Sequence, residues 1–367
     1  MFNLFRGKPK TCLGIDIGTS SIKVVQLKRS EGRYKLEAYG ELQTYGYLER
    51  LNDPFQTKNL QLLESQVTEM LGKIIKEASI TTKKVALSIP IFSSFISVVD
   101  LSPMSEKELS RALVFESKRY IPVSLDEVKI DWEVIDKQPV DSKDQAGMVP
   151  KKGLFKFRVL LVAVPKEVII KYLRITRNLG LEILALELEN FSYTRSLVGN
   201  DLSTACVLDF GARSTSFTIV DKGFIQMSHS LDIAGTELTK ALAHSMGIDF
   251  KRAEIYKKER GLDHKELEAG REIKEVILTL IDKVIFEIER AIGSYESKTK
   301  RKVAKLILSG GSGNLFGLDE YLKNKLKIDV ISGNPWAKVV YPSIIEPALK
   351  EIAPKFAVAV GLAMREI

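Results

Sequence analysis

The sequence predicts an α/β protein built from two lobes of similar plan. Apolar, strand-like stretches alternate along its 367 residues with stretches whose apolar residues recur at helical spacing. Two strand–turn–strand units, at residues 13–27 and 207–223, each end the first strand in an Asp-x-Gly turn. A third, glycine-rich turn at residues 308–314 follows another strand and precedes a helix. The repeated unit indicates an internal duplication.

The composition is typical of an ordinary globular protein, with 45% hydrophobic and 28% charged residues, and it argues against a disordered chain. The longest apolar runs, at residues 159–164 and 356–364, fall far short of the roughly 18 residues that a membrane-spanning helix needs. Residues 1–10 lack the apolar core of a secretory signal. We therefore expect a cytoplasmic protein.

The net charge of +8 suits an acidic partner but does not identify one. The densest basic run, residues 297–305, contains no aromatic side chain, so we expect a solvated turn and no nucleic-acid binding. Cys12 and Cys206 each precede an Asp-x-Gly turn and are expected to be buried thiols. The three histidines have no partners at ligand spacing, which argues against a zinc site.

The first lobe is expected to open with a meander of three strands, because strand-like segments alternate with polar turns. A helix should follow, since apolar side chains then recur at helical spacing and give one face for packing on a sheet. The expected elements are strands at 13–18, 21–29, 34–42 and 85–90 and a helix at 61–78.

Residues 84–181 have a different plan and predict a small α+β insert. Ser105 and Glu108 form a capping-box pattern in front of an apolar helix face. Residues 137–152 are rich in Gly, Pro and charge and are expected to form a mobile hairpin or loop. The expected elements are strands at 95–101, 129–136 and 157–165 and helices after Ser105 and at 166–178.

After residue 181 the pattern restarts, returning to the first lobe and then entering the second. The expected elements are a strand and connecting helix within 181–199, a hairpin at 207–220, helices within 232–261, a long helix at 271–295, a strand–turn–helix unit at 305–326 and a closing helix at 354–364. The resulting domains are the first lobe at 1–83 and 182–203, the insert at 84–181, the second lobe at 204–234 and 303–367, and its small subdomain at 235–302.

The two Asp-x-Gly turns could hold a phosphate chain if they faced each other across a cleft. Backbone N–H groups in such turns bind phosphate oxygens, because glycine lets the chain approach closely and hydroxyl groups add donors. The candidate phosphate-binding residues are Gly18, Thr19, Ser20 and Lys23 in the first half and Gly211, Ala212 and Arg213 in the second.

The carboxylates of Asp16 and Asp209 would repel a phosphate chain unless a divalent cation lay between them. Mg²⁺ fits this position, since it keeps most of its waters and takes one or two carboxylates together with phosphate oxygens. A single Asp-x-Gly turn would be explained by a plain hairpin. Two matched copies favour a shared nucleotide and metal site.

In their order, the three turns resemble the phosphate-one, phosphate-two and adenosine motifs of the actin-like ATPase superfamily, which has a duplicated, ribonuclease-H-like fold of two lobes around ATP and Mg²⁺. The resemblance spans nearly the whole chain. The adenosine-binding residues that it implies are Gly310, Gly311, Ser312 and Asn314.

Three further residues match the superfamily locally. Glu254 and Lys257 lie three apart on one helix face, where heat-shock members use such a pair to hold ribose and adenine; an exposed ion pair is the alternative. Glu189 resembles the connecting carboxylate that orders metal-bound water, although Asn190 is adjacent. The second phosphate turn departs from the superfamily's glycine-rich pattern, which implies weak ATPase activity at most and leaves the catalytic residue unidentified.

The insert is similar to that of the PilM family, the actin-like components of type IV pilus assembly and relatives of FtsA. The resemblance rests on residues 13–27, 89–136 and 180–195. Its most specific part is a helix followed by a Tyr-Ile-Pro sequence, carried by Met104, Glu108, Glu116, Tyr120, Ile121 and Pro122.

This resemblance implies a binding module more than a metabolic enzyme. Members of the family hold ATP and Mg²⁺ between their lobes and capture the cytoplasmic N-terminal peptide of the membrane protein PilN in a groove between the first lobe and the insert, an ordinary mode of peptide recognition. They join the inner-membrane complex and communicate with the motor ATPases. The implied location is cytoplasmic, peripheral to the inner membrane through PilN, and self-association stays open.

Three alternatives are weighed against this interpretation. An FtsA-like division protein shares the insert, but we expect it to end in an amphipathic membrane-targeting helix, which this sequence lacks. A plasmid-segregating filament protein would lack the insert. A sugar or acetate kinase of the same superfamily would need a substrate pocket, for which no motif is found.

Overall fold

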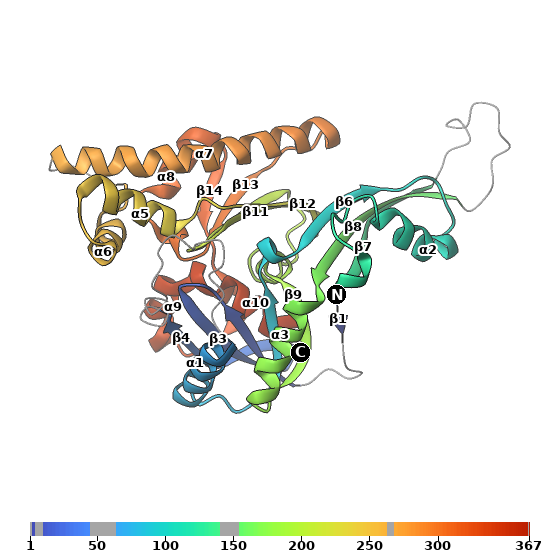
Figure 1. Ribbon diagram of the computed structural model, residues 1–367, viewed down its shortest axis with the longest axis horizontal. Helices are drawn as coiled ribbons and strands as arrows, with labels where there is room; N and C mark the ends of the chain where they lie inside the picture. The colour runs from blue at the N-terminus through green and yellow to red at the C-terminus, as the bar shows by residue number, and fades with distance from the viewer. Residues whose placement is uncertain (1, 4–9, 45–63, 140–153, 263–267, 366) are drawn as a thin grey trace.

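The computed structural model describes residues 2–3, 10–44, 64–139, 154–262, 268–365 and 367 (Figure 1). The strands among these residues form three sheets, of seven, five and three strands. The seven-stranded sheet belongs to the first lobe, the five-stranded sheet to the second, and the three-stranded sheet to the insert, which projects sideways from between the lobes in Figure 1.

The predicted meander of the first lobe is confirmed, since its three strands pair antiparallel in sequence order. The strands of this sheet, in spatial order, are β1 (Phe2–Asn3), β9 (Glu182–Leu188), β5 (Lys84–Ile89), β2 (Thr11–Ile17), β3 (Ser21–Ser30), β4 (Arg33–Gln43) and β15 (Val339–Val340). Helices α1 (Glu64–Glu77) and α3 (Lys166–Asn178) share a buried apolar core with one face of the sheet.

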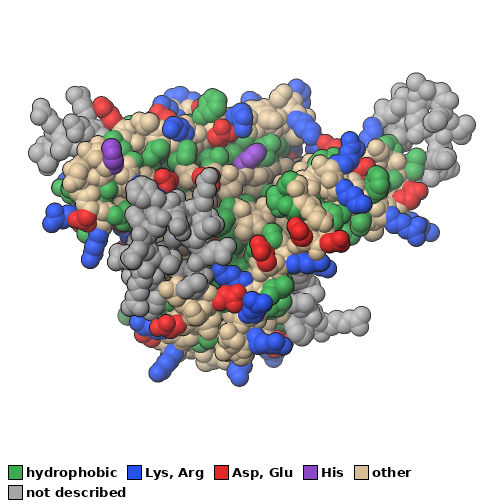
Figure 2. Space-filling view, in the orientation of Figure 1, with side chains coloured by type: hydrophobic (Ala, Val, Ile, Leu, Met, Phe, Trp, Pro, Cys, Tyr) green, Lys and Arg blue, Asp and Glu red, His purple; other side chains and the backbone are tan. Residues whose placement is uncertain are grey.

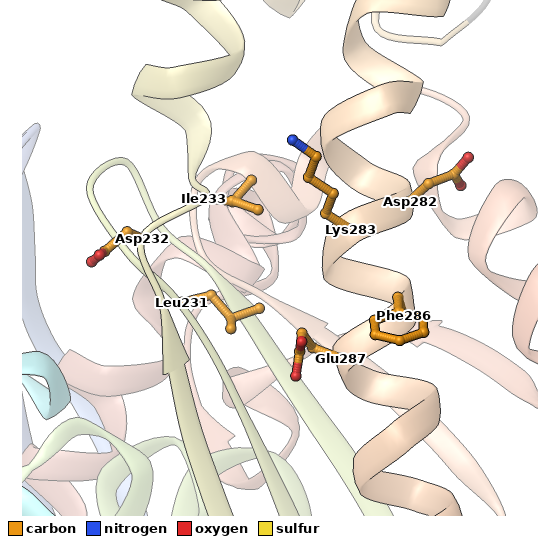
Figure 3. Close-up of a pocket in the computed structure, with 7 residues that line it drawn as sticks. All are labelled: Leu231, Asp232, Ile233, Asp282, Lys283, Phe286 and Glu287. Carbon is orange, nitrogen blue, oxygen red and sulfur yellow. The ribbon is translucent and has the colours of Figure 1, made fainter.

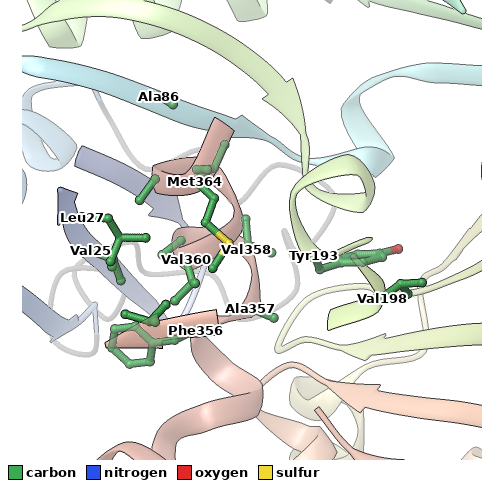
Figure 4. Close-up of a cluster of buried hydrophobic side chains, with 14 of the residues drawn as sticks. Val25, Leu27, Ala86, Tyr193, Val198, Phe356, Ala357, Val358, Val360 and Met364 are labelled. Atoms are coloured by element: carbon green, nitrogen blue, oxygen red, sulfur yellow. The ribbon is translucent and has the colours of Figure 1, made fainter. Parts of the chain in front are cut away.

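Helix α10 (Ala357–Arg365) packs on the opposite face of the sheet, in a core that also includes residues of α4 (Glu189–Tyr193) and of the π-helical turn that follows it (Figure 4). Helix α10 lies so close to the sheet and to α4 that two glycines have no room for a side chain. A Cβ atom on Gly14 would lie 2.0 Å from the Ala359 carbonyl oxygen, and one on Gly361 would lie 1.9 Å from the Ser192 carbonyl oxygen. The closing helix is therefore clamped between the sheet and the connecting helix.

The second lobe repeats the plan of the first. Its sheet runs in the order β12 (Phe224–Leu231), β11 (Thr215–Asp221), β10 (Ala205–Phe210), β13 (Lys305–Ser309) and β14 (Asp329–Ser332). As β2 pairs antiparallel with β3 and parallel with β5, so β10 pairs antiparallel with β11 and parallel with β13. This correspondence supports the predicted duplication.

Helices of the second lobe share a buried apolar core with its sheet. They are α5 (Gly235–Met246), α6 (Phe250–Arg260), α7 (Glu268–Thr299) and α8 (Leu318–Leu326), and α9 (Glu346–Ile352) precedes the closing helix. Helix α7 extends beyond the predicted 271–295 at both ends and stops before Lys300, where φ is +59°. Cys12 and Cys206 are buried thiols, as predicted, and burial raises the pKa of Cys206 to about 12.

The insert sheet has the order β6 (Phe95–Asp100), β8 (Phe155–Pro165) and β7 (Val128–Pro139), and α2 (Glu106–Ser117) begins with the predicted capping box of Ser105 and Glu108. The block predicted at 84–181 is wider than this sheet, because β5 and α3 pack with the first lobe. Residues 137–139 continue β7 and are not part of a loop; residues 140–152 of the predicted loop lie outside the described residues.

Candidate functional site

The two predicted phosphate turns are closed by the same backbone hydrogen bond. The N–H of Gly18 donates to the Ser21 carbonyl at 3.1 Å, and the N–H of Gly211 donates to the Ser214 carbonyl at 3.1 Å. Each turn also accepts hydrogen bonds from another segment. In the first turn, the N–H of Thr44 donates to the Ser20 carbonyl at 2.9 Å, and the Thr44 hydroxyl donates to the Thr19 carbonyl at 2.6 Å. In the second turn, the N–H of Gly235 donates to the Gly211 carbonyl, and the N–H of Thr236 donates to the Ala212 carbonyl.

The carboxylates at the ends of β2 and β10 also have matched partners. Asp16 accepts a hydrogen bond from the Ser88 hydroxyl at 3.0 Å, and Asp209 accepts one from the Ser309 hydroxyl at 2.9 Å. Both serines lie at the same relative place, on the strand that pairs parallel with the carboxylate's own strand. Lys23 adds an ion pair to Asp16 at 3.4 Å. Sequence reasoning missed both serines, although ALSIP and LILSG place them alike at strand ends.

The two carboxylates raise the pKa of a third carboxyl group, that of Glu189, which lies between the lobes. Burial, followed by the charges of Asp16 and Asp209, raises the pKa of Glu189 well above its usual value. Burial and the charge of Asp16 raise the pKa of Asp209 to about 6, against the opposing effects of its bond from Ser309 and of Lys23. The fold therefore brings residues 16, 189 and 209 into one electrostatic environment. The adjacent Asn190 instead donates to the Ser228 hydroxyl at 3.2 Å.

The donor set of this environment suits a weakly chelated cation. In the described part of the chain, no three His, Cys, Asp or Glu side chains are arranged to hold a metal ion by themselves. Asp16 and Asp209 are each held by a serine hydroxyl and present carboxylate oxygens from opposite lobes. Mg²⁺ accepts this chemistry, since it commonly takes one or two carboxylates and completes its shell with water and phosphate.

On the adenosine side, Glu254 and Lys257 form an ion pair with 2.7 Å between Nζ and Oε2; Lys257 is buried and Glu254 is mostly covered, so the alternative of an exposed pair is wrong. The Lys257 ammonium group also donates to the Gly235 carbonyl and to the Thr239 hydroxyl, both at 2.8 Å. Because Gly235 donates to Gly211, the pair is linked to the second phosphate turn through a single residue.

The glycine-rich turn after β13 lies against the same phosphate turn. Gly310 has a φ of +84°, and a Cβ atom there would lie 2.5 Å from the Phe210 carbonyl oxygen, so only glycine fits. The Ser312 hydroxyl donates to the Gly211 carbonyl at 3.3 Å. The amide of Asn314 is directed elsewhere and donates to the Glu351 carbonyl at 3.1 Å. Gly311 has open space around its Cα hydrogen.

Two hollows lie away from these turns. One, of about 540 Å³, lies between the end of β12 and α7 and contains none of the predicted site residues (Figure 3). The other, of about 190 Å³, lies between the insert sheet and the first lobe. Its lining residues are Ile89, Asp131, Trp132, Glu133, Leu160, Val162, Val164, Leu188 and Phe191. Sequence reasoning placed a groove between these two bodies but named no residue in it.

The surface shows no concentrated basic face in the view of Figure 2, where Lys and Arg side chains are spread over both lobes among Asp and Glu. Within the described ranges, every helix is too short or too polar to cross a lipid bilayer.

Solved structures similar to this chain share its two-lobed fold. A chain of the "PilM-PilN type IV pilus biogenesis complex" matches with a TM-score of 0.79 at 23% identity, covering 98% of this chain and 99% of that chain. MreB5 of Spiroplasma citri, in a crystal structure bound to ADP, matches with a TM-score of 0.52 at 11% identity, covering 96% and 94%. The predicted actin-like fold is confirmed.

Sequence comparison gives the family. The cell division protein FtsA of Staphylococcus epidermidis is 20% identical over 93% of this chain and 79% of its own length. The family model for the type IV pilus assembly protein PilM matches residues 14–367, which include both lobes and the insert. The chain therefore belongs to the PilM family of type IV pilus assembly proteins.

Proposed function

We propose that this chain is a cytoplasmic, ATP-binding scaffold of type IV pilus assembly, which binds the cytoplasmic N-terminal peptide of a PilN-type membrane protein. Membership of the PilM family and the likeness to the solved PilM–PilN complex support the assembly role. A peripheral place at the inner membrane, through that partner, and a link to the motor ATPases belong to the same proposal.

The nucleotide half of the proposal rests on the matched phosphate turns with their matched Asp–Ser pairs. Gly18, Thr19 and Ser20 would hold phosphate oxygens from the first lobe, and Gly211, Ala212 and Arg213 from the second. Lys23 would neutralise charge beside Asp16. The likeness to an ADP-bound MreB5 supports a nucleotide in this fold.

Mg²⁺ would be held by Asp16 and Asp209, with Glu189 orienting its water, and when bound it would neutralise the phosphate chain. Adenosine would contact Gly310, Gly311 and Ser312, with Glu254 and Lys257 on the ribose side; Asn314 would join them only by giving up its bond to the Glu351 carbonyl. Ala212 and Arg213 replace the more open glycines typical of this turn. We therefore expect slow hydrolysis.

The peptide half of the proposal rests on the smaller hollow. Its walls are mostly apolar and come from β7 and β8 of the insert and from β5 and β9 of the first lobe. The carboxyl groups of Asp131 and Glu133 add acidic character, and burial raises the pKa of Glu133. A short peptide with apolar side chains and a basic group complements such a groove.

Titration calorimetry with the first dozen residues of the PilN-type partner tests the peptide half. Trp132→Ala removes the largest side chain lining the groove and should weaken binding at least about tenfold, as expected for a buried aromatic contact. Tyr120→Ala, an exposed aromatic of the insert outside the groove, is the matched control and should bind like the unaltered chain. Equal affinities for both variants would refute the assigned groove.

A separate titration with ATP in millimolar Mg²⁺ tests the nucleotide half. The unaltered chain should bind, and Asp16→Asn together with Asp209→Asn should lose the dependence of binding on Mg²⁺. If the unaltered chain does not bind ATP under these conditions, the proposed nucleotide binding is refuted and the proposed peptide binding is unaffected.

A further inference from the structure

One side chain of the second phosphate turn reaches out of its own lobe. The guanidinium carbon of Arg213 lies 4.8 Å from the centre of the Phe92 ring, a cation–π contact. Phe92 lies in the short 3₁₀ turn Ile91–Ser93, which connects β5 of the first lobe with β6 of the insert. Phe92 remains 42% exposed, so this contact is not part of a packed core.

The turn that carries Phe92 also contacts the proposed metal site. The N–H of Ile91 donates to Oε2 of Glu189 at 3.3 Å. Two hydroxyl groups stiffen the turn: Ser93 donates to the Pro90 carbonyl and Ser94 to the Ile91 carbonyl, both at 2.8 Å. Phe92 is therefore fixed to a rigid joint between the carboxylate site and the first strand of the insert.

The same guanidinium belongs to a turn suited to hold phosphate. A bidentate, charge-assisted bond from Arg to a phosphate is considerably stronger than a cation–π contact at an exposed ring. A phosphate that arrives at residues 211–213 would therefore compete with Phe92 for Arg213 and win.

We propose that Arg213 is a positioning residue that exchanges the Phe92 ring for the terminal phosphate of a bound nucleoside triphosphate, and thereby reports the nucleotide state to the joint of the insert. The inference rests on the proposed ATP binding and gives a reason for an arginine in place of a glycine in this turn. With a triphosphate bound, the insert loses one of its ties to the second lobe. With a diphosphate bound, the tie persists.

A double-mutant cycle on the full chain tests this exchange. Removing the competing ring by Phe92→Ala should tighten binding of ATP with Mg²⁺ by about two- to fivefold, the value of an exposed cation–π contact. The same change made in an Arg213→Ala background should leave the affinity for ATP unaltered. Phe92→Ala should not tighten the binding of ADP in either background. Phe224→Ala removes a similarly exposed ring on β12 and is the control.

Phe92→Leu separates the ring from its bulk. Leucine keeps most of the packing but has no π face, so it should behave like alanine. If Phe92→Ala leaves ATP affinity unaltered, or alters it equally with and without Arg213, the exchange is refuted while ATP binding stands. If the unaltered chain binds no ATP, the exchange and the nucleotide half of the proposed function fall together.

Discussion

At the scale of single residues, the site combines two acidic groups that would repel each other without a cation. This repulsion contributes to the raised pKa of Asp209. Burial and the charge of Asp16 raise that pKa to about 6, whereas in the unfolded chain it would be about 3.8. A carboxyl group with a raised pKa binds its proton more tightly in the folded chain. Stability without ligand therefore falls as pH rises from about 4 to 6 and stays lower above.

Asp209→Asn should remove this penalty. Above pH 6 the variant without ligand should have a free energy of unfolding about 2–3 kcal/mol higher than the unaltered chain, and the difference should shrink below pH 4. It should also lose most of the stabilisation by ATP and Mg²⁺. Urea denaturation across pH, with exposed Asp136→Asn as control, measures both. A variant less stable than the parent at pH 7.5 would contradict the prediction.

The buried pair of Glu254 and Lys257 gives a second prediction. Lys257→Met leaves the Gly235 carbonyl without its ammonium donor and leaves Glu254 only the more exposed ion pair with Lys258, so it should cost about 2–4 kcal/mol of folding free energy. Adding Glu254→Gln should recover part of this loss. Lys240→Met removes the more exposed pair with Glu237 and should cost less than about 1 kcal/mol. Equal losses for the two lysine variants would show that the Lys257 pair is energetically a surface pair.

The sequence contained the aspartates and the turns but not their partners. Asp16 and Asp209 could be named because Asp-x-Gly recurs with the same spacing after a strand. Ser88 and Ser309 could not, because their role depends on which strands pair parallel. The contact of Arg213 with Phe92 joins positions that no local pattern relates. Residues that meet through topology are therefore the ones that sequence reasoning missed.

At the scale of secondary structure elements, periodicity and capping predicted helices well. Helix α3 has the predicted bounds, and α2 has its predicted capping box. The neighbours of these helices could not be predicted. The spacing of apolar residues in α3 predicts one buried face, but this face could pack on the insert as well as on the first lobe, where the structure places it. The apolar pattern fixes the buried face of an element but not its neighbour.

The clamped helix α10 allows a test by one kind of substitution at two sites. Gly361→Ala places a methyl group 1.9 Å from the Ser192 carbonyl oxygen and should cost about 3 kcal/mol or more, because backbone must shift. Gly293→Ala on α7 meets nothing within 4 Å and should stabilise the chain by about 0.5–1 kcal/mol through helix propensity. Thermal unfolding of both variants measures the contrast. A loss at Gly293 as large as at Gly361 would refute the clamp.

At the scale of the whole molecule, the proposed nucleotide site and the proposed peptide groove share structural elements. The groove includes Ile89 at the end of β5, and the next two residues lead into the turn that contacts Glu189. The second lobe is also joined directly to the insert, where Lys298 of α7 pairs with Asp100 of β6 at 2.9 Å. A ligand that alters the angle between the lobes should therefore also alter the groove.

We expect ATP with Mg²⁺ to change the affinity for the PilN-type peptide by about 5- to 150-fold, equivalent to about 1–3 kcal/mol of coupling. Linkage requires the peptide to change the affinity for ATP by the same factor. Calorimetric titration of each ligand with and without saturating amounts of the other measures both factors. Identical dissociation constants in all four titrations would mean that the two sites are independent, whereas unequal factors would indicate that a third process, such as self-association, accompanies binding.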